Sequence, residues 1–226
     1  MLQASVISEF IHTNRCLQHD IRKIQIKSPM FKNKIFLIIF IIGIAGIVFY
    51  SLNTSEPYSE TVKKQRAEFE QNLMAEKDSP IANLKDFSGI KYFDANEKFI
   101  LNADYQRFNS SEQGMILMTD STQTEIEKVG NATFSIDGKS FTVSIFDEGE
   151  ILMLPFRDLT SGKETYGGGR FINIPKDKLV GNKIEIDFNN AHNFYCAYNE
   201  SYICPIPPKE NFIAAEIRAG EKKYKE

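Results

Sequence analysis

Residues 132–146 read ATFSIDGKSFTVSIF, and this stretch decides the expected fold. Apolar and polar residues alternate on both sides of Asp137-Gly138. An Asp-Gly pair between two alternating runs is the strongest short-range signal for a β-hairpin. We therefore expect two antiparallel strands, residues 132–136 and 141–146, joined by a tight turn.

Similar short runs lie on both sides of this hairpin. They cover residues 99–103, 115–118, 124–129, 151–156, 171–174, 183–188 and 213–217. Eight or nine short strands with turn residues between them, and no alternation of strand and helix, are typical of an antiparallel barrel or sandwich. The expected fold class is thus mainly β: an antiparallel β-barrel or sandwich-like domain with an N-terminal helix, preceded by a single transmembrane helix.

The N-terminal part carries a membrane signal. Residues 35–50 (IFLIIFIIGIAGIVFY) contain no charge, and with their uncharged flanks they reach the length of about 20 residues that a helix needs to cross a bilayer. Lys32 and Lys34 precede the run, and Glu56 and Glu60 are the first charges after it, which places the N-terminus in the cytoplasm. A cleaved signal peptide is the alternative. Because no small-residue cleavage pattern follows, an uncleaved anchor is favoured.

The chain divides into four expected segments. Residues 1–34 form a cytoplasmic or targeting segment, in which Met30 begins the layout of an export signal and is the expected true start. Residues 35–52 are the transmembrane anchor. Residues 53–80, rich in helix-forming Glu, Lys, Gln and Ala, form a juxtamembrane helix. Residues 81–226 form the β domain.

Composition narrows the range of functions. The net charge of −3 lacks the basic excess of general nucleic-acid binders, so no nucleic-acid partner is expected. Residues 160–165 (TSGKET) contain Gly-Lys but lack the upstream Gly of a phosphate-binding loop, which argues against a nucleotide site of that kind. No cofactor is predicted.

Polar, Gly, Pro and Cys residues concentrate in residues 154–211. Within them, Arg157 could hold a carboxylate or phosphate through two parallel hydrogen bonds. Its structural alternative is an ion pair with Asp187 or Glu210. The glycine run at 167–169 permits close backbone approach and could cup an anion with help from the neighbouring arginine, or it could simply connect two strands.

The ligand-binding candidates share a polar or charged side chain beside a turn or a strand end. They are Arg157, Asp158, Tyr166, Arg170, Asp187, Asn189, Asn193, Tyr198, Glu210 and Asn211. Polar loops at the mouth of a barrel are a common place for a ligand site. No set of nucleophile, base and orienting group is visible, so no catalytic residue is assigned.

Cys196 and Cys204 are separated by seven residues, and the expected topology places both outside the cytoplasm, where a disulfide is favoured. Zinc with His192 as a third ligand is one alternative, although the spacing matches no standard zinc motif. A thiol nucleophile paired with His192 is another. No metal site is predicted.

Three segments together resemble the DUF1684 family, a bacterial domain of unknown function. They are FRDLTSGKETYGGGRF (156–171), DFNNAHNFYCAY (187–198) and CPIPPKENFIAAEIRAGE (204–221). The resemblance also includes residues 87–93 and spans residues 60–221. It implies a bacterial protein that is exported or anchored, and it supplies no reaction. The sequence His192-Asn193-Phe194 departs from the Tyr-Asn-Pro common in the family, which makes a His-based mechanism less expected.

Two functions from different classes follow, and a third hypothesis is that the motif only builds the fold, through a disulfide, a glycine turn and an arginine–carboxylate network. The first is a membrane-anchored protein of the bacterial cell membrane, facing the periplasm or the cell exterior, that binds a small polar or anionic ligand or an envelope partner. The alternative is an envelope hydrolase, with Asp158, Asp187 or Glu210 as general base and Arg170 stabilising negative charge. Burial of both Arg157 and Arg170 in ion pairs, without an open cavity, would exclude the first.

Overall fold

The structure is a computed structural model that describes residues 34–53, 56–81 and 87–224. The chain forms two compact units that divide between Ser55 and Glu56. In the first unit, helix α2 (Lys34–Asn53) is long and apolar enough to cross a membrane, although a signal sequence near the N-terminus passes the same test. The expected start at Met30 lies outside the described residues.

The second unit contains helix α3 (Tyr58–Ala75) and a nine-stranded sheet. Its strands are β1 (Ile100–Leu117), β2 (Gln123–Ile136), β3 (Lys139–Asp147), β4 (Ile151–Asp158), β5 (Arg170–Pro175), β6 (Leu179–Val180), β7 (Lys183–Asp187), β8 (His192–Asn193) and β9 (Phe212–Ile213). Short 3-10 turns in the same region are η4 (Phe188–Asn190), η5 (Tyr195–Ala197) and η6 (Lys209–Asn211).

The hairpin predicted around Asp137-Gly138 is confirmed. Strands β2 and β3 pair up to Ile136 and Lys139, and both turn residues have positive φ, 49° and 77°, as a type I′ turn requires. The expected strands at 124–129 and 132–136 are one continuous strand with a register shift between Lys128 and Gly130. The expected strand at 213–217 was too long, because only Phe212–Ile213 pairs as a strand.

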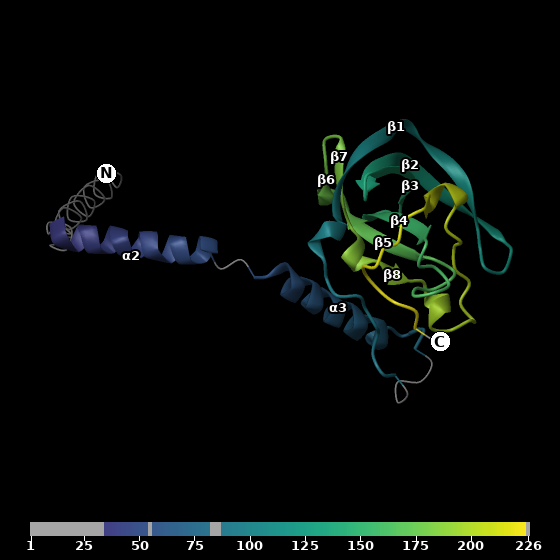
Figure 1. Ribbon diagram of the computed structural model, residues 1–226, viewed down its shortest axis with the longest axis horizontal. Helices are drawn as coiled ribbons and strands as arrows, with labels where there is room; N and C mark the ends of the chain where they lie inside the picture. Colours follow the sequence, from purple (N-terminus) through teal and green to yellow (C-terminus); the bar gives the residue numbers. More distant parts are fainter. Residues whose placement is uncertain (1–33, 54–55, 82–86, 225–226) are drawn as a thin grey trace, which may run out of the picture. The chain divides into compact units, whose positions relative to one another are not determined.

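The sheet does not close into a barrel, so that part of the fold prediction was wrong. The strand order is β6-β7-β1-β2-β3-β4-β5-β8, with β9 added in parallel beside β4 and every other pair antiparallel. The sheet curves strongly (Figure 1). Its end strands β6 and β8 have two residues each, and each pairs only with its one neighbour, β7 or β5. A single sheet also excludes a two-sheet sandwich.

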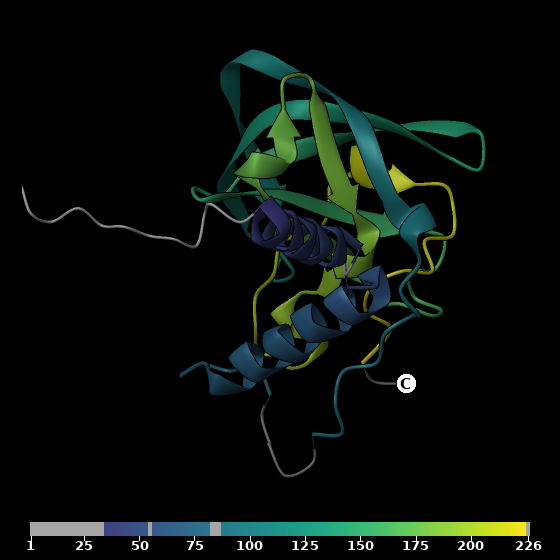
Figure 2. The same ribbon diagram turned by 90° about the vertical axis from the view of Figure 1, so that its left-hand side faces the viewer.

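The concave side of the sheet holds the main hydrophobic core. Phe188 packs edge-on against Phe134 and Phe156, with ring centroids 5.7 and 5.2 Å apart. Helix α3 packs against the same unit (Figure 2) through Val62 and Leu73, both buried. The helix expected within residues 53–80 therefore contacts the β-sheet of this unit through its few apolar residues.

Candidate functional site

The end of β4 separates two neighbouring charged residues. Arg157 pairs in register with Phe212 of β9, and Asp158 with Ile213. Because successive side chains of a strand point to opposite faces, the two members of each pair share a face. Asp158 and Ile213 are buried, whereas Arg157 is half-buried and Phe212 is exposed. One face of this strand end therefore faces the interior and the other faces solvent.

On the inner face, Arg170 and Asp158 form an ion pair with both side chains buried. Their closest nitrogen and oxygen are 3.4 Å apart. The Arg170 guanidinium also donates to the carbonyl oxygens of Ile217 (3.0 Å), Glu221 (3.3 Å) and Ala219. Burial lowers the pKa of Arg170, and the Asp158 carboxylate opposes this effect. Arg170 thus fastens the C-terminal segment to the sheet and offers no surface to a ligand, contrary to the prediction.

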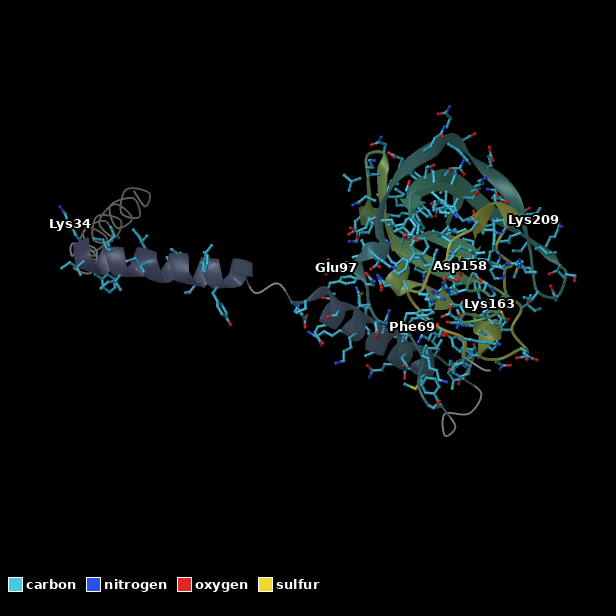
Figure 3. The ribbon with its side chains drawn as sticks, viewed as in Figure 1. Lys34, Phe69, Glu97, Asp158, Lys163 and Lys209 are labelled. Carbon is cyan, nitrogen blue, oxygen red and sulfur yellow. The ribbon has the colours of Figure 1, made fainter. Side chains whose placement is uncertain are left out.

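The buried Asp158 carboxylate also accepts hydrogen bonds from other groups of the protein. It accepts hydrogen bonds from the hydroxyl of Thr160 (2.9 Å) and the backbone N–H of Ile217 (2.8 Å). The Thr160 hydroxyl lies 2.9 Å from that of Thr165 in the same turn. These bonds explain the polar turn at residues 160–165 as a structural element. Figure 3 shows Asp158 among the side chains of the domain, with Lys209 further out.

A second buried carboxylate, Glu221, is a residue that the sequence interpretation missed. It accepts hydrogen bonds from the backbone N–H (2.9 Å) and side-chain amide (2.6 Å) of Asn193, and from the Tyr198 hydroxyl (2.8 Å). Burial raises the pKa of Glu221 to about 7 in spite of these donors. Asn193 and Tyr198, both predicted ligand contacts, are therefore buried partners of a carboxylate. The only signal was its position at the end of the motif, next to a charged tail.

Glu221 predicts a specific pH dependence of stability. In the folded protein the Glu221 carboxyl group keeps its proton up to about pH 7, whereas in the unfolded chain it loses the proton near its ordinary pKa of 4.5. The Glu221 contribution to the free energy of unfolding is therefore full below pH 4.5 and falls by about 3 kcal/mol as pH rises to 7. Denaturant titrations give the free energy of unfolding at each pH, and we expect the value for the wild type minus that for Glu221→Gln to show this fall.

This subtraction separates the effect of Glu221 from that of His192. Burial lowers the pKa of His192 to about 4, so His192 changes the stability in the opposite direction. A flat difference would contradict the assignment.

The other predicted carboxylates and amides also serve the fold. The Asp187 carboxylate accepts from the hydroxyl of Tyr58 (2.6 Å) and the backbone N–H of Asn189 (2.9 Å). The Asn189 side chain is buried and bonds to the backbone of Asn96. Glu210 lies 4.0 Å from Lys128 at the surface. The alternative ion pair of Arg157 with Asp187 or Glu210 is therefore not formed.

The Asn211 side chain takes the place of backbone hydrogen bonds that β3 and β4 do not make with each other. Strands β3 and β4 pair only at Phe146–Met153 and Asp147–Leu152, and beyond them Pro155 has no N–H to offer. The Asn211 amide bridges the gap, since it donates to the carbonyls of Ser144 (2.9 Å) and Pro155 (2.8 Å) and accepts from the Ser144 N–H (2.7 Å). This predicted ligand contact is fully buried.

The predicted disulfide is not formed, because Cys196 and Cys204 are buried free thiols. The Cys196 N–H donates to the Cys204 sulfur (3.1 Å), and the Tyr166 hydroxyl donates to the Cys196 sulfur (3.6 Å). The two sulfurs thus take part in hydrogen bonds within an aromatic cluster that includes Phe194. The hydrogen bond from the Cys204 thiol lowers the pKa of Cys196 to about 6 and raises that of Cys204.

His192 does not join the two cysteines. Its ring stacks on Phe171 (centroids 4.0 Å apart) and meets the edge of Phe69 on α3 (4.8 Å). No group of three His, Cys, Asp or Glu side chains able to hold a metal ion occurs in the described part of the chain. His192 is therefore not placed as a third zinc ligand beside the two cysteines. It also does not pair with either cysteine thiol.

On the outer face, Arg157 opens onto a cavity of about 450 Å³. We call this the Arg157 cavity, and it is lined by Arg157, Asp158, Ser161, Gly167, Pro207, Pro208, Lys209 and Phe212. No described residue forms an ion pair or hydrogen bond with the Arg157 guanidinium. The Lys209 side chain is exposed at the same cavity, whereas the Asp158 carboxylate is already neutralised from within. The Arg157 cavity therefore presents positive charge beside apolar proline and phenylalanine surface.

Comparison with known proteins places these features in a family. The profile of a family described as a protein of unknown function, DUF1684, matches residues 85–222, more than half of the sequence. The chain belongs to the DUF1684 family. The match ends one residue after Glu221, so the DUF1684 profile includes both the buried carboxylates and the residues of the Arg157 cavity.

The DUF1684 chain also resembles a solved structure. An uncharacterized protein of Haloarcula marismortui, determined by solution NMR, is 30% identical, with a TM-score of 0.60. The similarity covers 73% of this chain and 94% of that one. No match was found among functionally curated proteins. The comparisons thus support the family and the mainly antiparallel β fold.

Proposed function

We propose that this protein is a membrane-anchored binding module whose β domain holds a small anionic ligand in the Arg157 cavity. The observation that carries the proposal is the unpaired guanidinium of Arg157 beside exposed Lys209. A guanidinium with free donors binds carboxylate or phosphate through two parallel hydrogen bonds, and a nearby ammonium adds charge. The volume of about 450 Å³ lies within the usual range for small-molecule sites.

The apolar part of the lining narrows the ligand further. Pro207 and Pro208 form one side of the Arg157 cavity, and Phe212 lies beside Arg157 in the β4–β9 register. Apolar surface next to a fixed cation suits an anion that carries a hydrophobic or ring-shaped group. Phenyl phosphate has this combination and is a suitable first probe.

The proposed location is the outer side of a bacterial cell membrane. Helix α2 would act as an uncleaved anchor, with the lysines before it in the cytoplasm and the β domain in the periplasm or outside the cell. Carbonate extraction of membranes tests this: an anchored chain stays in the pellet, whereas a chain cleaved after α2 is released.

An envelope hydrolase gains no support from the positions of its proposed residues. Arg170 and the Asp158 carboxylate are buried and bonded to each other, Asp187 is bonded to Tyr58, and Glu210 lies near Lys128. A general base needs access to a substrate proton, and an oxyanion-stabilising arginine needs free donors. The binding module is therefore the function that we put forward.

We expect Arg157→Ala to weaken binding of phenyl phosphate at least ten-fold, since a charge-assisted hydrogen bond contributes about 1.5–3 kcal/mol. Isothermal titration calorimetry on the full chain measures this. Arg218→Ala is the matched control, because Arg218 is exposed, pairs with Glu164 and Glu216, and does not line the cavity. Equal affinity of Arg157→Ala and wild type, or no binding by either, would contradict the proposal.

A further inference from the structure

A second recess lies where the curved sheet fails to close. Strand β5 pairs with β8 only at Arg170 and Phe171, and β7 pairs with β6 only at Lys183 and Ile184. The remaining outer edges of β5 and β7 therefore have no strand partner. Helix α3 contributes side chains over this opening, and residues of both strands and of the helix line one cavity of about 340 Å³.

A neighbouring cavity of about 310 Å³ lies toward His192. The two cavities share Gln65, Asn173, Pro175 and Asn190 in their lining, so they lie side by side, and we call them together the seam groove. Every shared side chain is uncharged. Gln65, Asn173 and Asn190 carry both hydrogen-bond donors and acceptors, and Gln65 and Asn173 are exposed without a side-chain hydrogen bond to any described residue.

His192 lies at the inner end of the seam groove. It is 9% exposed and lines the 310 Å³ cavity, yet its imidazole makes no hydrogen bond within residues 34–53, 56–81 and 87–224. Its ring nitrogens are not fully buried, so they reach the space of this cavity, where a ligand hydroxyl group can pair with them. Burial keeps this ring neutral at pH 7, since its pKa is about 4. A neutral imidazole offers one donor and one acceptor.

The charged groups of the seam groove already have partners. Lys178 and Glu185 are 2.6 Å apart, and Asp187 accepts from Tyr58 and Asn189. The Arg66 guanidinium donates to backbone carbonyls and lies over the ring of Tyr92, 4.5 Å from its centroid. The Nε atom of Arg66 is buried without a partner, and the other charged groups are compensated within the protein, so most groups free to meet a ligand are uncharged. An uncharged ligand with hydroxyl groups matches the free amides and the imidazole.

We propose that the seam groove binds an uncharged oligosaccharide, with a sugar ring in each cavity and His192 hydrogen-bonded to a hydroxyl group at the inner end. Phe69 lines the inner cavity and would pack against the C–H face of a sugar ring, whereas Tyr92 carries the Arg66 guanidinium over one face of its ring. Amide side chains beside aromatic rings suit hydroxyl groups, each of which both donates and accepts. This inference is independent of the Arg157 cavity, which is lined by different residues and is proposed to bind an anion instead of an uncharged ligand.

The direct test observes the His192 ring nitrogens during a sugar titration. The chain contains three histidines, so ¹⁵N-histidine labelling of the full chain in a detergent without a sugar headgroup gives few signals. Cellobiose, maltose and diacetylchitobiose are the neutral probes, and the charged disaccharides cellobiouronate and chitobiose, which have the same length, are the comparators. We expect at least one neutral disaccharide to shift the His192 signals in a saturable way, with the comparators at least ten-fold weaker. No shift with any neutral probe, or equal binding of the comparators, would overturn the proposal.

Variants separate binding from folding. Asn173→Ala and Gln65→Ala remove exposed side chains that both cavities share, so each is expected to weaken sugar binding about five-fold or more without lowering the unfolding midpoint. Asn102→Ala and Gln106→Ala on the exposed face of β1 are the matched controls and should leave affinity unchanged. His192→Phe keeps the aromatic stack and should abolish binding, whereas Arg157→Ala should bind sugar normally. Wild-type affinity of Asn173→Ala would contradict the assignment.

Discussion

Replacing Arg170 with Met is expected to lower the free energy of unfolding by about 3–5 kcal/mol, the usual cost of breaking a buried ion pair. The change leaves the Asp158 carboxylate buried without its cation. It also removes the donors to the carbonyl oxygens of Ile217, Ala219 and Glu221, which stay buried. Denaturant unfolding followed by circular dichroism measures the loss.

Two further variants show whether the loss comes from the buried pair. Arg218→Met breaks ion pairs at the surface, where such pairs contribute little, and should leave the unfolding midpoint nearly unchanged. Arg170→Met combined with Asp158→Asn should cost less than the sum of the two single changes, because the neutral amide no longer needs a cation. A small loss for Arg170→Met, or full additivity, would show that the pair does not hold the C-terminal segment.

Replacing Asn211 with Ala is expected to cost about 3–5 kcal/mol, since three buried backbone groups lose their partner at about 1–3 kcal/mol each. Those groups are the N–H and C=O of Ser144 and the C=O of Pro155, on strands that do not pair with each other at this point. The same unfolding measurement applies. Asn102→Ala, an exposed asparagine on β1, is the control and should change the midpoint little. Similar midpoints for both variants would contradict the bridging role.

The local parts of the fold could be predicted from sequence, and the long-range parts could not. The alternation around Asp137-Gly138 defines its own hairpin, because turn type and strand pattern are set by neighbouring residues. Closure of the sheet depends on whether the end strands β6 and β8 pair with each other, and the sequence pattern within a strand does not predict this long-range pairing. The fold prediction was therefore right in class and wrong about the barrel.

The candidate site shows the same division. Arg157 and Asp158 are adjacent and charged, so alternation shows that they face opposite ways but not which one faces inward. Arg170 and Asp158 lie on different strands, so their pairing depends on the sheet, and Glu221, the last residue of the 204–221 segment, was not predicted as a site residue. Cys196 and Cys204 are close in sequence and in space, yet their sulfurs take part in hydrogen bonds instead of a disulfide. Most residues of the motif stabilise the fold, and Arg157 is the residue that we propose contacts a ligand.

The most direct test follows the NMR signals of the arginine Nε atoms of the full chain during a titration with phenyl phosphate. It distinguishes the arginine proposed to bind a ligand from the arginine that stabilises the fold. We expect the Arg157 signal to shift in a saturable way, while the signal of buried Arg170 stays in place. A shift of Arg170 without Arg157, or no shift of Arg157 at saturating phenyl phosphate, would contradict it.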